Sequence, residues 1–192
     1  MINLKQLAFT STLSLAMATP AFATVLTFED VDVQQTDSPL YGTAQLSDGY
    51  GGISGWQSAG AVYGYADGLN EGIGANLFYG NGGELTFDNA PVVFQGTYYK
   101  SYGASDPIVS IELFYKGISV HSIQDPQSGN GLVWLNSDYH GLVDRIVLRG
   151  GAEGMAIDNL TYEVSAVPEP STYGLIVMGL MTLALRGRKC RN

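Results

Sequence analysis

Hydrophobic and polar residues alternate along much of the middle of this chain, with the two-residue period of β-strands. The clearest case is residues 108–115, where Val109, Ile111, Leu113 and Tyr115 share one face. Between residues 24 and 165 no stretch keeps the apolar period of a helix over three turns. Short runs between turn residues instead predict strands at residues 25–28, 83–87, 92–99, 108–115, 118–123, 132–135, 144–149 and 155–164.

Strands in this number, separated by such short turns, predict an all-β antiparallel sandwich. Its core is expected to draw on apolar residues of several strands, namely Val109, Ile111, Leu113, Val120, Val133, Leu135, Ile146, Leu148, Ile157 and Leu160. Residues 40–82 are rich in Gly and Tyr and contain few good strand patterns. We expect this stretch to form long loops over one face or rim of the sandwich.

The first 23 residues carry a different pattern. A single cation precedes an apolar stretch, residues 7–18, and the letters P-A-F-A follow it. Small residues at Ala21 and Ala23 form an A-x-A cleavage pattern, so residues 1–23 are predicted to be a helical secretory signal peptide that is removed after Ala23. The mature domain is then residues 24–165.

The end of the chain combines a rigid motif, an apolar run and a basic end. The motif consists of Val167, Pro168, Glu169, Pro170 and Ser171, and its two prolines favour an extended backbone. The apolar run, residues 172–185, is predicted to form a membrane helix. The basic residues after it predict a cytoplasmic C-terminus, and they are Arg186, Arg188, Lys189 and Arg191.

This apolar run is short for a membrane span. Even counted from Ser171, it extends over 15 residues, which form about 22 Å of helix. The hydrocarbon core of a bilayer is ~30 Å thick and needs ~20 residues. The segment is therefore marginal as a lasting anchor, and it suits a segment that an intramembrane enzyme holds and cuts. A plain tail anchor is the alternative.

In the order of these three parts, residues 167–191 resemble the PEP-CTERM sorting signal of Gram-negative bacteria. The resemblance rests on V-P-E-P-S, the short apolar run and the basic end. It implies recognition by an exosortase, a transpeptidase of the inner membrane. The enzyme would remove the helix and transfer the protein to the cell surface or the exopolysaccharide matrix, so the membrane would hold the chain only in transit.

The domain ahead of this tail resembles the jelly-roll domains of many PEP-CTERM proteins and, more loosely, carbohydrate-binding modules. The resemblance rests on the order of T-F-E-D, G-Y-G-G, F-Q-G-T-Y-Y, I-E-L-F-Y-K-G, D-R-I-V-L and A-I-D-N-L-T-Y-E. It implies a jelly-roll topology and a structural Ca²⁺ shared by Glu29 and Asp158, on the first and last strands. Since Ca²⁺ takes about six to eight oxygens, two carboxylates would be only part of a site. Alternatively, Asp30, Asp158 and Asn159 cap strand ends and turns.

The charge of the mature domain restricts its partners. It has 17 acidic and four basic side chains, so its formal net charge is −13. Nucleic acid is excluded as a natural partner because its binding needs a basic footprint, whereas divalent cations or neutral sugars suit an acidic domain. The one cysteine, Cys190, lies beyond the apolar run. No disulfide is therefore expected in the domain.

Aromatic residues are candidates for stacking on sugars, because Tyr and Trp combine an apolar ring with a polar group. Trp56 is flanked by glycines and polar residues, and with Tyr63 and Tyr65 it forms the predicted sugar platform. The alternative is that these rings fill the core of the sandwich.

Sequence patterns typical of catalysis are missing. His121 and His140 lack the spacing of metal ligands, and no nucleophile or phosphate-binding motif occurs. We therefore expect a non-enzymatic exported protein that binds or embeds in exopolysaccharide. The alternatives are a structural surface protein without a ligand, a glycan hydrolase, and an ice-binding protein, which would need regular Thr arrays that the chain lacks.

Overall fold

The computed structural model describes residues 22–35, 41–65, 74–103, 109–124, 132–165 and 178–180. The chain divides into two compact units, one of them Phe22–Val167 and the other residues 1–21 with 168–192. The predicted signal peptide up to Ala21, the sorting motif and the basic end lie outside the described residues, and of the predicted membrane helix only residues 178–180 are described, as helical. Within the described residues, no helix has the length and apolar character needed to cross a membrane.

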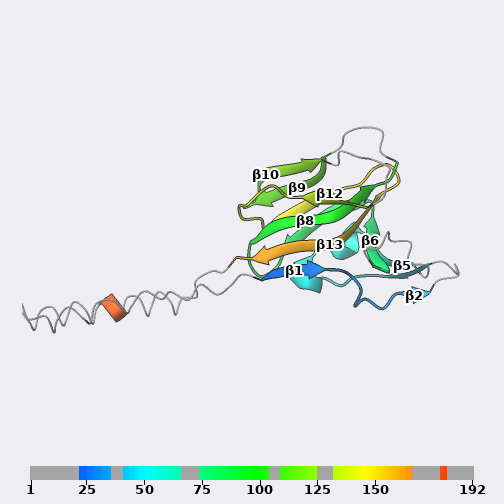
Figure 1. Ribbon diagram of the computed structural model, residues 1–192, viewed down its shortest axis with the longest axis horizontal. Helices are drawn as coiled ribbons and strands as arrows, with labels where there is room; N and C mark the ends of the chain where they lie inside the picture. Colours follow the sequence, from blue (N-terminus) through cyan, green and yellow to red (C-terminus); the bar gives the residue numbers. More distant parts are fainter. Residues whose placement is uncertain are drawn as a thin grey trace, which may run out of the picture. The chain divides into compact units, whose positions relative to one another are not determined.

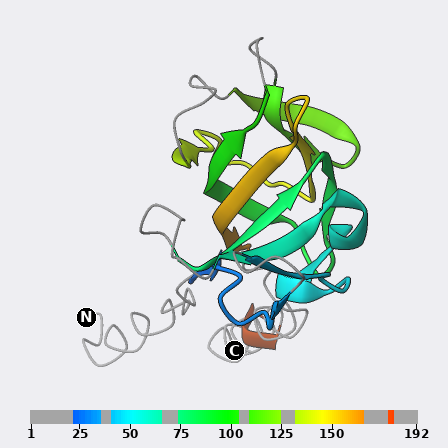
Figure 2. The same cartoon turned by 90° about the vertical axis from the view of Figure 1, so that its right-hand side faces the viewer.

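The larger of two antiparallel sheets lies in the first unit (Figures 1 and 2). Its strands follow the order β11-β8-β13-β6-β5-β3-β2, and β1 also pairs with β13. These strands are β1 (Ala23–Leu26), β2 (Gln34–Gln35), β3 (Tyr41–Ala44), β5 (Ala61–Tyr65), β6 (Asn76–Gly80), β8 (Val92–Ser101), β11 (Val133–Asn136) and β13 (Met155–Val164).

The smaller sheet has the strand order β10-β9-β12-β7-β4. These strands are β4 (Ile53–Ser54), β7 (Gly82–Phe87), β9 (Val109–Tyr115), β10 (Ile118–Gln124) and β12 (Arg145–Arg149). A 3₁₀ turn at Tyr50–Gly52 and a one-turn helix, α1 (Trp56–Ala59), lie between the early strands. The all-β, antiparallel two-sheet prediction is thus confirmed, while the jelly-roll topology and the terminal helices stay predictions.

The two sheets share one hydrophobic core. Leu85 and Ile146 from the smaller sheet and Phe78 and Ile157 from the larger one are fully buried in the same cluster. The hydroxyl of Tyr99 in β8 donates a hydrogen bond to a carbonyl in β12, so it ties the two sheets together. Burial of this apolar surface is the main stabilising contribution to the fold.

Most of the predicted core residues are buried: Ile111, Leu113, Leu135, Ile146, Leu148, Ile157 and Leu160. Val120 and Val133 are partly buried and pack against this core, and the side chain of Val109 lies outside the described residues. The sequence-based core omitted its aromatic part, in particular Phe28 and Phe94, which are fully buried.

The prediction of long loops over residues 40–82 is wrong. This stretch contributes β3, β4, β5, β6 and α1. Some of its glycines, inside strands or directly beside them, let backbones approach: a Cβ on Gly80, in β6, would overlap the carbonyl oxygen of Ala59, and a Cβ on Gly60, directly before β5, would overlap that of Tyr79. Glycine inside a strand can mark close backbone approach as well as a turn.

The partners of β13 change along its length. Residues Met155, Ala156 and Ile157 pair with β6, and Leu160 to Glu163 pair with β1. Between these two segments the register with β8 shifts, and Asn159 has a left-handed φ of 49°. A β-bulge at such a point changes the direction of side chains. Asp158 and Asn159 lie between the segment of β13 that pairs with β6 and the segment that pairs with β1.

Candidate functional site

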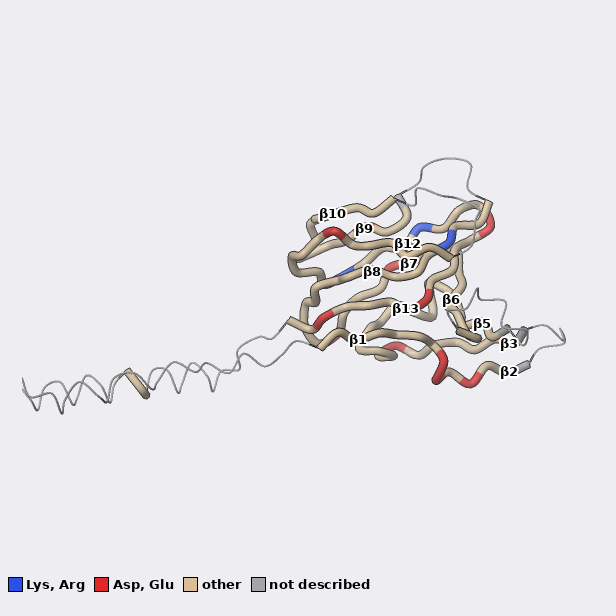
Figure 3. Tube along the Cα trace, viewed as in Figure 1, with Lys and Arg blue, Asp and Glu red and all other residues tan. Residues whose placement is uncertain are grey.

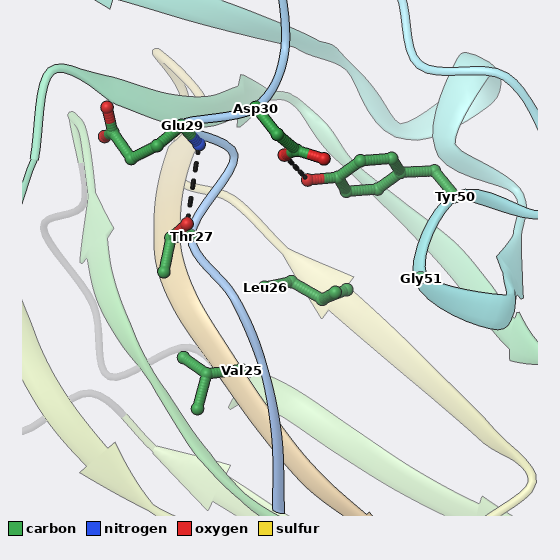
Figure 4. A pocket seen from close by; sticks show the side chains of 7 residues that line it. All are labelled: Val25, Leu26, Thr27, Glu29, Asp30, Tyr50 and Gly51. Carbon is green, nitrogen blue, oxygen red and sulfur yellow. Dashed lines mark hydrogen bonds between the residues drawn. The ribbon is translucent and has the colours of Figure 1, made fainter.

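The end of β1 forms the first wall of a carboxylate-bearing pocket (Figure 4). The chain turns sharply at Phe28, which has a φ of 60° and is fully buried, so the next two residues, Glu29 and Asp30, are exposed. The pocket has a volume of about 600 Å³. It is lined by Val25, Leu26, Thr27, Glu29, Asp30, Tyr50 and Gly51.

Glu29 is held by the start of β6. Its Oε1 accepts a hydrogen bond of 2.9 Å from the backbone N–H of Asn76. The buried Asn76 amide in turn donates to the carbonyls of Phe28, at 2.9 Å, and Val31, at 3.1 Å. Asn76 therefore fixes the turn after β1 and the position of the Glu29 carboxylate together.

Asp158 is a fully buried acid on β13. Its Oδ1 accepts a hydrogen bond of 2.6 Å from the backbone N–H of Asn159. Within the described part of the chain, neither Asp158 Oδ2 nor Asn159 Oδ1 has a hydrogen-bond partner. Two neighbouring acceptor oxygens are thus buried without a donor, an arrangement that is costly unless a proton or a cation compensates it.

The negative charge of Glu29 acts on Asp158, the carboxylate with which the sequence pairs it. Burial raises the pKa of Asp158 to about 7; the Asn159 N–H opposes this shift, and the negative charge of nearby Glu29 adds to it. The electrostatic contact follows from the pairing of β1 with β13 and of β6 with β13, which brings the turn after β1 to the bulge. Glu29 is therefore a candidate partner of Asp158, although neither Asp158 nor Asn159 lines the pocket in Figure 4.

The oxygens at this site have the hard chemistry that Ca²⁺ prefers. They are the Glu29 carboxylate and the unpartnered Oδ2 of Asp158 and Oδ1 of Asn159. Among the described residues no three His, Cys, Asp or Glu side chains form a metal-binding group. A cation here would therefore rely on amide, carbonyl and water oxygens for its remaining ligands, as Ca²⁺ commonly does.

Tyr50 closes the other side of the pocket. Its hydroxyl donates a 2.6 Å hydrogen bond to Asp30 Oδ1, and Figure 4 shows this pair pointing away from Glu29. Partial burial and the bond to Asp30 raise the pKa of the Tyr50 hydroxyl above its ordinary value. Tyr50 thus stays neutral and serves as a hydrogen-bond donor.

A second candidate surface is the outer face of the larger sheet. Val62 and Phe78 point into the core, so by strand alternation Tyr63 and Tyr79 point away from it. The rings of Tyr63 and Tyr79 meet edge to face at 5.4 Å, and Tyr79 meets Tyr102 at 5.7 Å. The ring edges and faces offer the apolar contacts on which sugars stack.

The sugar platform stays a prediction, and the structure places its residues differently. Tyr63 is partly exposed and lines a hollow of about 280 Å³ together with Tyr79, while the side chain of Tyr65 lies outside the described residues. The sequence analysis did not single out Tyr79. Strand alternation in N-L-F-Y-G could have found it, once this stretch was recognised as a strand.

The assignment of Trp56 to this platform is wrong, because Trp56 is completely buried. Its ring packs edge to face on Phe28, at 5.7 Å, and Phe78, at 5.0 Å. Its indole N–H donates to the carbonyl of Tyr50 at 3.0 Å. Gly55, with a φ of 101°, makes the turn that directs α1 inward, so the flanking glycines bury this ring instead of exposing it.

The fold and sites thus define a β-rich domain with a carboxylate pocket and an aromatic outer face. Residues 166–189 match the family model of the PEP-CTERM protein-sorting motif. This match confirms the predicted sorting signal and implies recognition by an exosortase of a protein that is exported and transiently membrane-anchored. No curated protein and no solved structure matches the chain.

Proposed function

We propose that this chain is an exosortase substrate whose β-rich domain works at the cell surface or in the exopolysaccharide matrix. The observation that carries the proposal is the sorting motif at residues 166–189, which begins at the end of the compact unit Phe22–Val167. The A-x-A pattern ending at Ala23 supports export through the inner membrane. The β-rich domain is then the part that is exported, and the tail is the signal that directs its sorting.

Deletion of the exosortase gene tests the proposal. In the parent cells the domain is expected in the surface or matrix fraction, without the apolar run. In the deletion strain the uncleaved chain is expected to remain in the inner membrane. A variant that ends at Ser165 is the control. Because it lacks the sorting signal, it should be released from the inner membrane. Unchanged processing in the deletion strain would contradict the proposal.

The role of the domain that we favour is association with exopolysaccharide, without catalysis. The aromatic outer face supports it, as does the scarcity of basic positions (Figure 3). His121 stacks on Tyr139 at 5.8 Å, which favours a packing role for this histidine. A structural surface protein without its own ligand is the alternative, and retention of the purified domain on the exopolysaccharide of its own cells distinguishes the two.

We further propose that Glu29, Asp158 and Asn159 hold a structural Ca²⁺. The support is the pair of buried, unpartnered oxygens beside the Glu29 charge. The ion would supply the positive charge that the buried Asp158 carboxylate otherwise lacks. It would also join the turn after β1 to β13.

Thermal unfolding of the EDTA-treated domain with and without CaCl₂ tests this site. At a Ca²⁺ concentration one hundred times the dissociation constant, binding to the folded state adds about 2.7 kcal/mol, or roughly 8 °C in Tm for a domain of this size. Asp158→Asn should abolish the rise, and Asp88→Asn, at an exposed acid, should keep it. An unchanged Tm of the parent domain on addition of Ca²⁺ rules the site out.

A further inference from the structure

The hollow beside Tyr63 and Tyr79 owes its shape to backbone. Gly60 directly precedes β5 and Gly80 ends β6, and a side chain at either position would overlap a neighbouring carbonyl. Because both glycines line the hollow without a side chain, backbone forms this part of its wall. The ring of Tyr79 is fixed at the wall, since its hydroxyl donates to the carbonyl of Glu153.

The rim of the hollow is made of uncharged polar side chains. Gln45, Gln57, Ser58 and Asn81 are exposed around it. Each amide offers both a donor and an acceptor, and each hydroxyl can do either. This mixture matches sugar hydroxyl groups, which donate and accept as well.

The charge of the hollow favours a neutral ligand. None of its ten lining residues is Asp, Glu, Lys or Arg. None of the four lysines and arginines of the domain lines the hollow. Arg145 and Arg149 pair with Glu84 and Glu112 at 2.8 Å, and Lys116 lies over Tyr115 at 5.0 Å. Lys100 lies over Tyr102 at 5.0 Å, and the Tyr102 ring meets that of Tyr79. An anionic glycan would find no counter-charge in this hollow and would meet a domain of net negative charge.

We propose that this hollow binds one neutral pyranose residue of a polysaccharide, with the ring against Tyr63 and Tyr79 and its hydroxyls on the amide rim. This proposal rests on the proposed association with exopolysaccharide and names its ligand class and subsite. The volume of about 280 Å³ is at the lower end of the range for small-ligand sites, which begins at about 300 Å³, and it therefore suits a single ring.

Affinity electrophoresis of residues 22–167 tests the subsite. This unit contains the entire described core, so it can be studied without the tail. The probes are three neutral polysaccharides (dextran, xylan and a β-1,3-glucan), the uronate polymer alginate, and the exopolysaccharide of the parent cells. We expect retention by at least one neutral probe and none by alginate.

Two variants locate the binding, and one controls for it. Tyr63→Ala and Gln57→Ala should each weaken retention by about tenfold or more, which corresponds to about 1.4 kcal/mol. Trp134→Ala removes an aromatic ring that is 42 % exposed, is paired with Tyr98, and does not line the hollow. It should retain parent affinity, and circular dichroism checks that all three variants are folded.

The outcomes separate the two proposals. Neutral-glycan binding that survives both hollow variants, or that is lost only in Trp134→Ala, overturns the subsite and leaves matrix association standing. Retention by alginate in preference to the neutral probes overturns the ligand class. A parent domain that is retained by none of the probes, including its own exopolysaccharide, overturns matrix association and the subsite with it.

Discussion

At the scale of one residue, Asp158 is a buried carboxylate whose charge has to be compensated by a proton or a cation. Its carboxylate is fully buried, and its Oδ2 has no partner among the described residues. Folding without a cation therefore favours the protonated form. The burial that would suit Asp158 to the proposed cation site makes its charged form destabilising when no cation is present.

The burial of Asp158 predicts an unusual pH dependence of stability in EDTA. The pKa of Asp158 is raised from an ordinary 3.8 to about 7 in the folded state, so its contribution is fully present below pH 3.8 and is lost as pH rises toward 7. The loss amounts to about 4 kcal/mol for this group. Urea unfolding in EDTA across this range measures it.

Asp158→Asn should remove this pH-dependent loss, because the amide has the same shape and does not titrate. Saturating Ca²⁺ should also remove it from the parent domain, since the ion neutralises the carboxylate. Identical pH profiles for the parent domain and Asp158→Asn in EDTA would contradict the argument.

The two tryptophans make opposite predictions. Trp56→Ala should lower the free energy of unfolding by about 3–5 kcal/mol, because it leaves a cavity between Phe28 and Phe78. Trp134→Ala, at a half-exposed position, should cost about 1 kcal/mol or less. Urea unfolding followed by circular dichroism measures both costs. If Trp56→Ala left stability unchanged but abolished glycan binding, Trp56 would be a surface residue after all.

The residues of the candidate sites differ in how far sequence could reveal them. The resemblance placed Glu29 and Asp158 on adjacent first and last strands; β1 and β13 do pair, but Glu29 lies in the turn after β1. The roles of Asn76 and Asn159 were not predictable, since they depend on the β13 bulge and on the partner change from β6 to β1. Trp56 was misassigned because glycines beside an aromatic ring do not reveal which way the chain turns.

At the scale of elements, the contact between α1 and the corner between β6 and β7 depends on glycines, which have no side chain. Gly80 lies against the backbone of Ala59, and Gly83 lies against its Cβ and Cα. Gly80 and the other glycines of residues 40–82 weakened the strand pattern of that stretch. Alternation of apolar and polar residues therefore predicted regular strands such as β9 and β12. It missed the strands in which glycines stand in place of larger side chains and allow close backbone packing.

Substitution of Gly80 tests this account of the corner. Gly80→Ala should cost about 3 kcal/mol or more, because the new methyl group meets backbone that cannot move aside. Gly117→Ala is a matched control at a turn, where φ is 77° and nothing lies within 4 Å of the added Cβ. It should cost only the left-handed strain, about 1–2 kcal/mol. Equal costs in urea unfolding would refute the close-packing explanation.

At the scale of the whole molecule, the division into two units gives the final prediction. Every buried apolar residue of the described chain lies between Leu26 and Tyr162, while the sorting motif covers residues 166–189. Since the core of the domain includes no described residue of the tail, removal of residues 166–192 should leave stability unchanged within about 0.5 kcal/mol.

Unfolding of residues 24–165 and 24–192, compared in the same detergent, measures this difference. A surface protein processed by an exosortase needs such independence, because the domain must keep its fold after the tail is cut away. Truncation at Leu160, which removes the end of β13 and its pairing with β1, is the destabilising control. If loss of the tail lowered stability as much as this truncation does, the tail would be part of the fold. The domain would then not be structurally independent of its sorting signal.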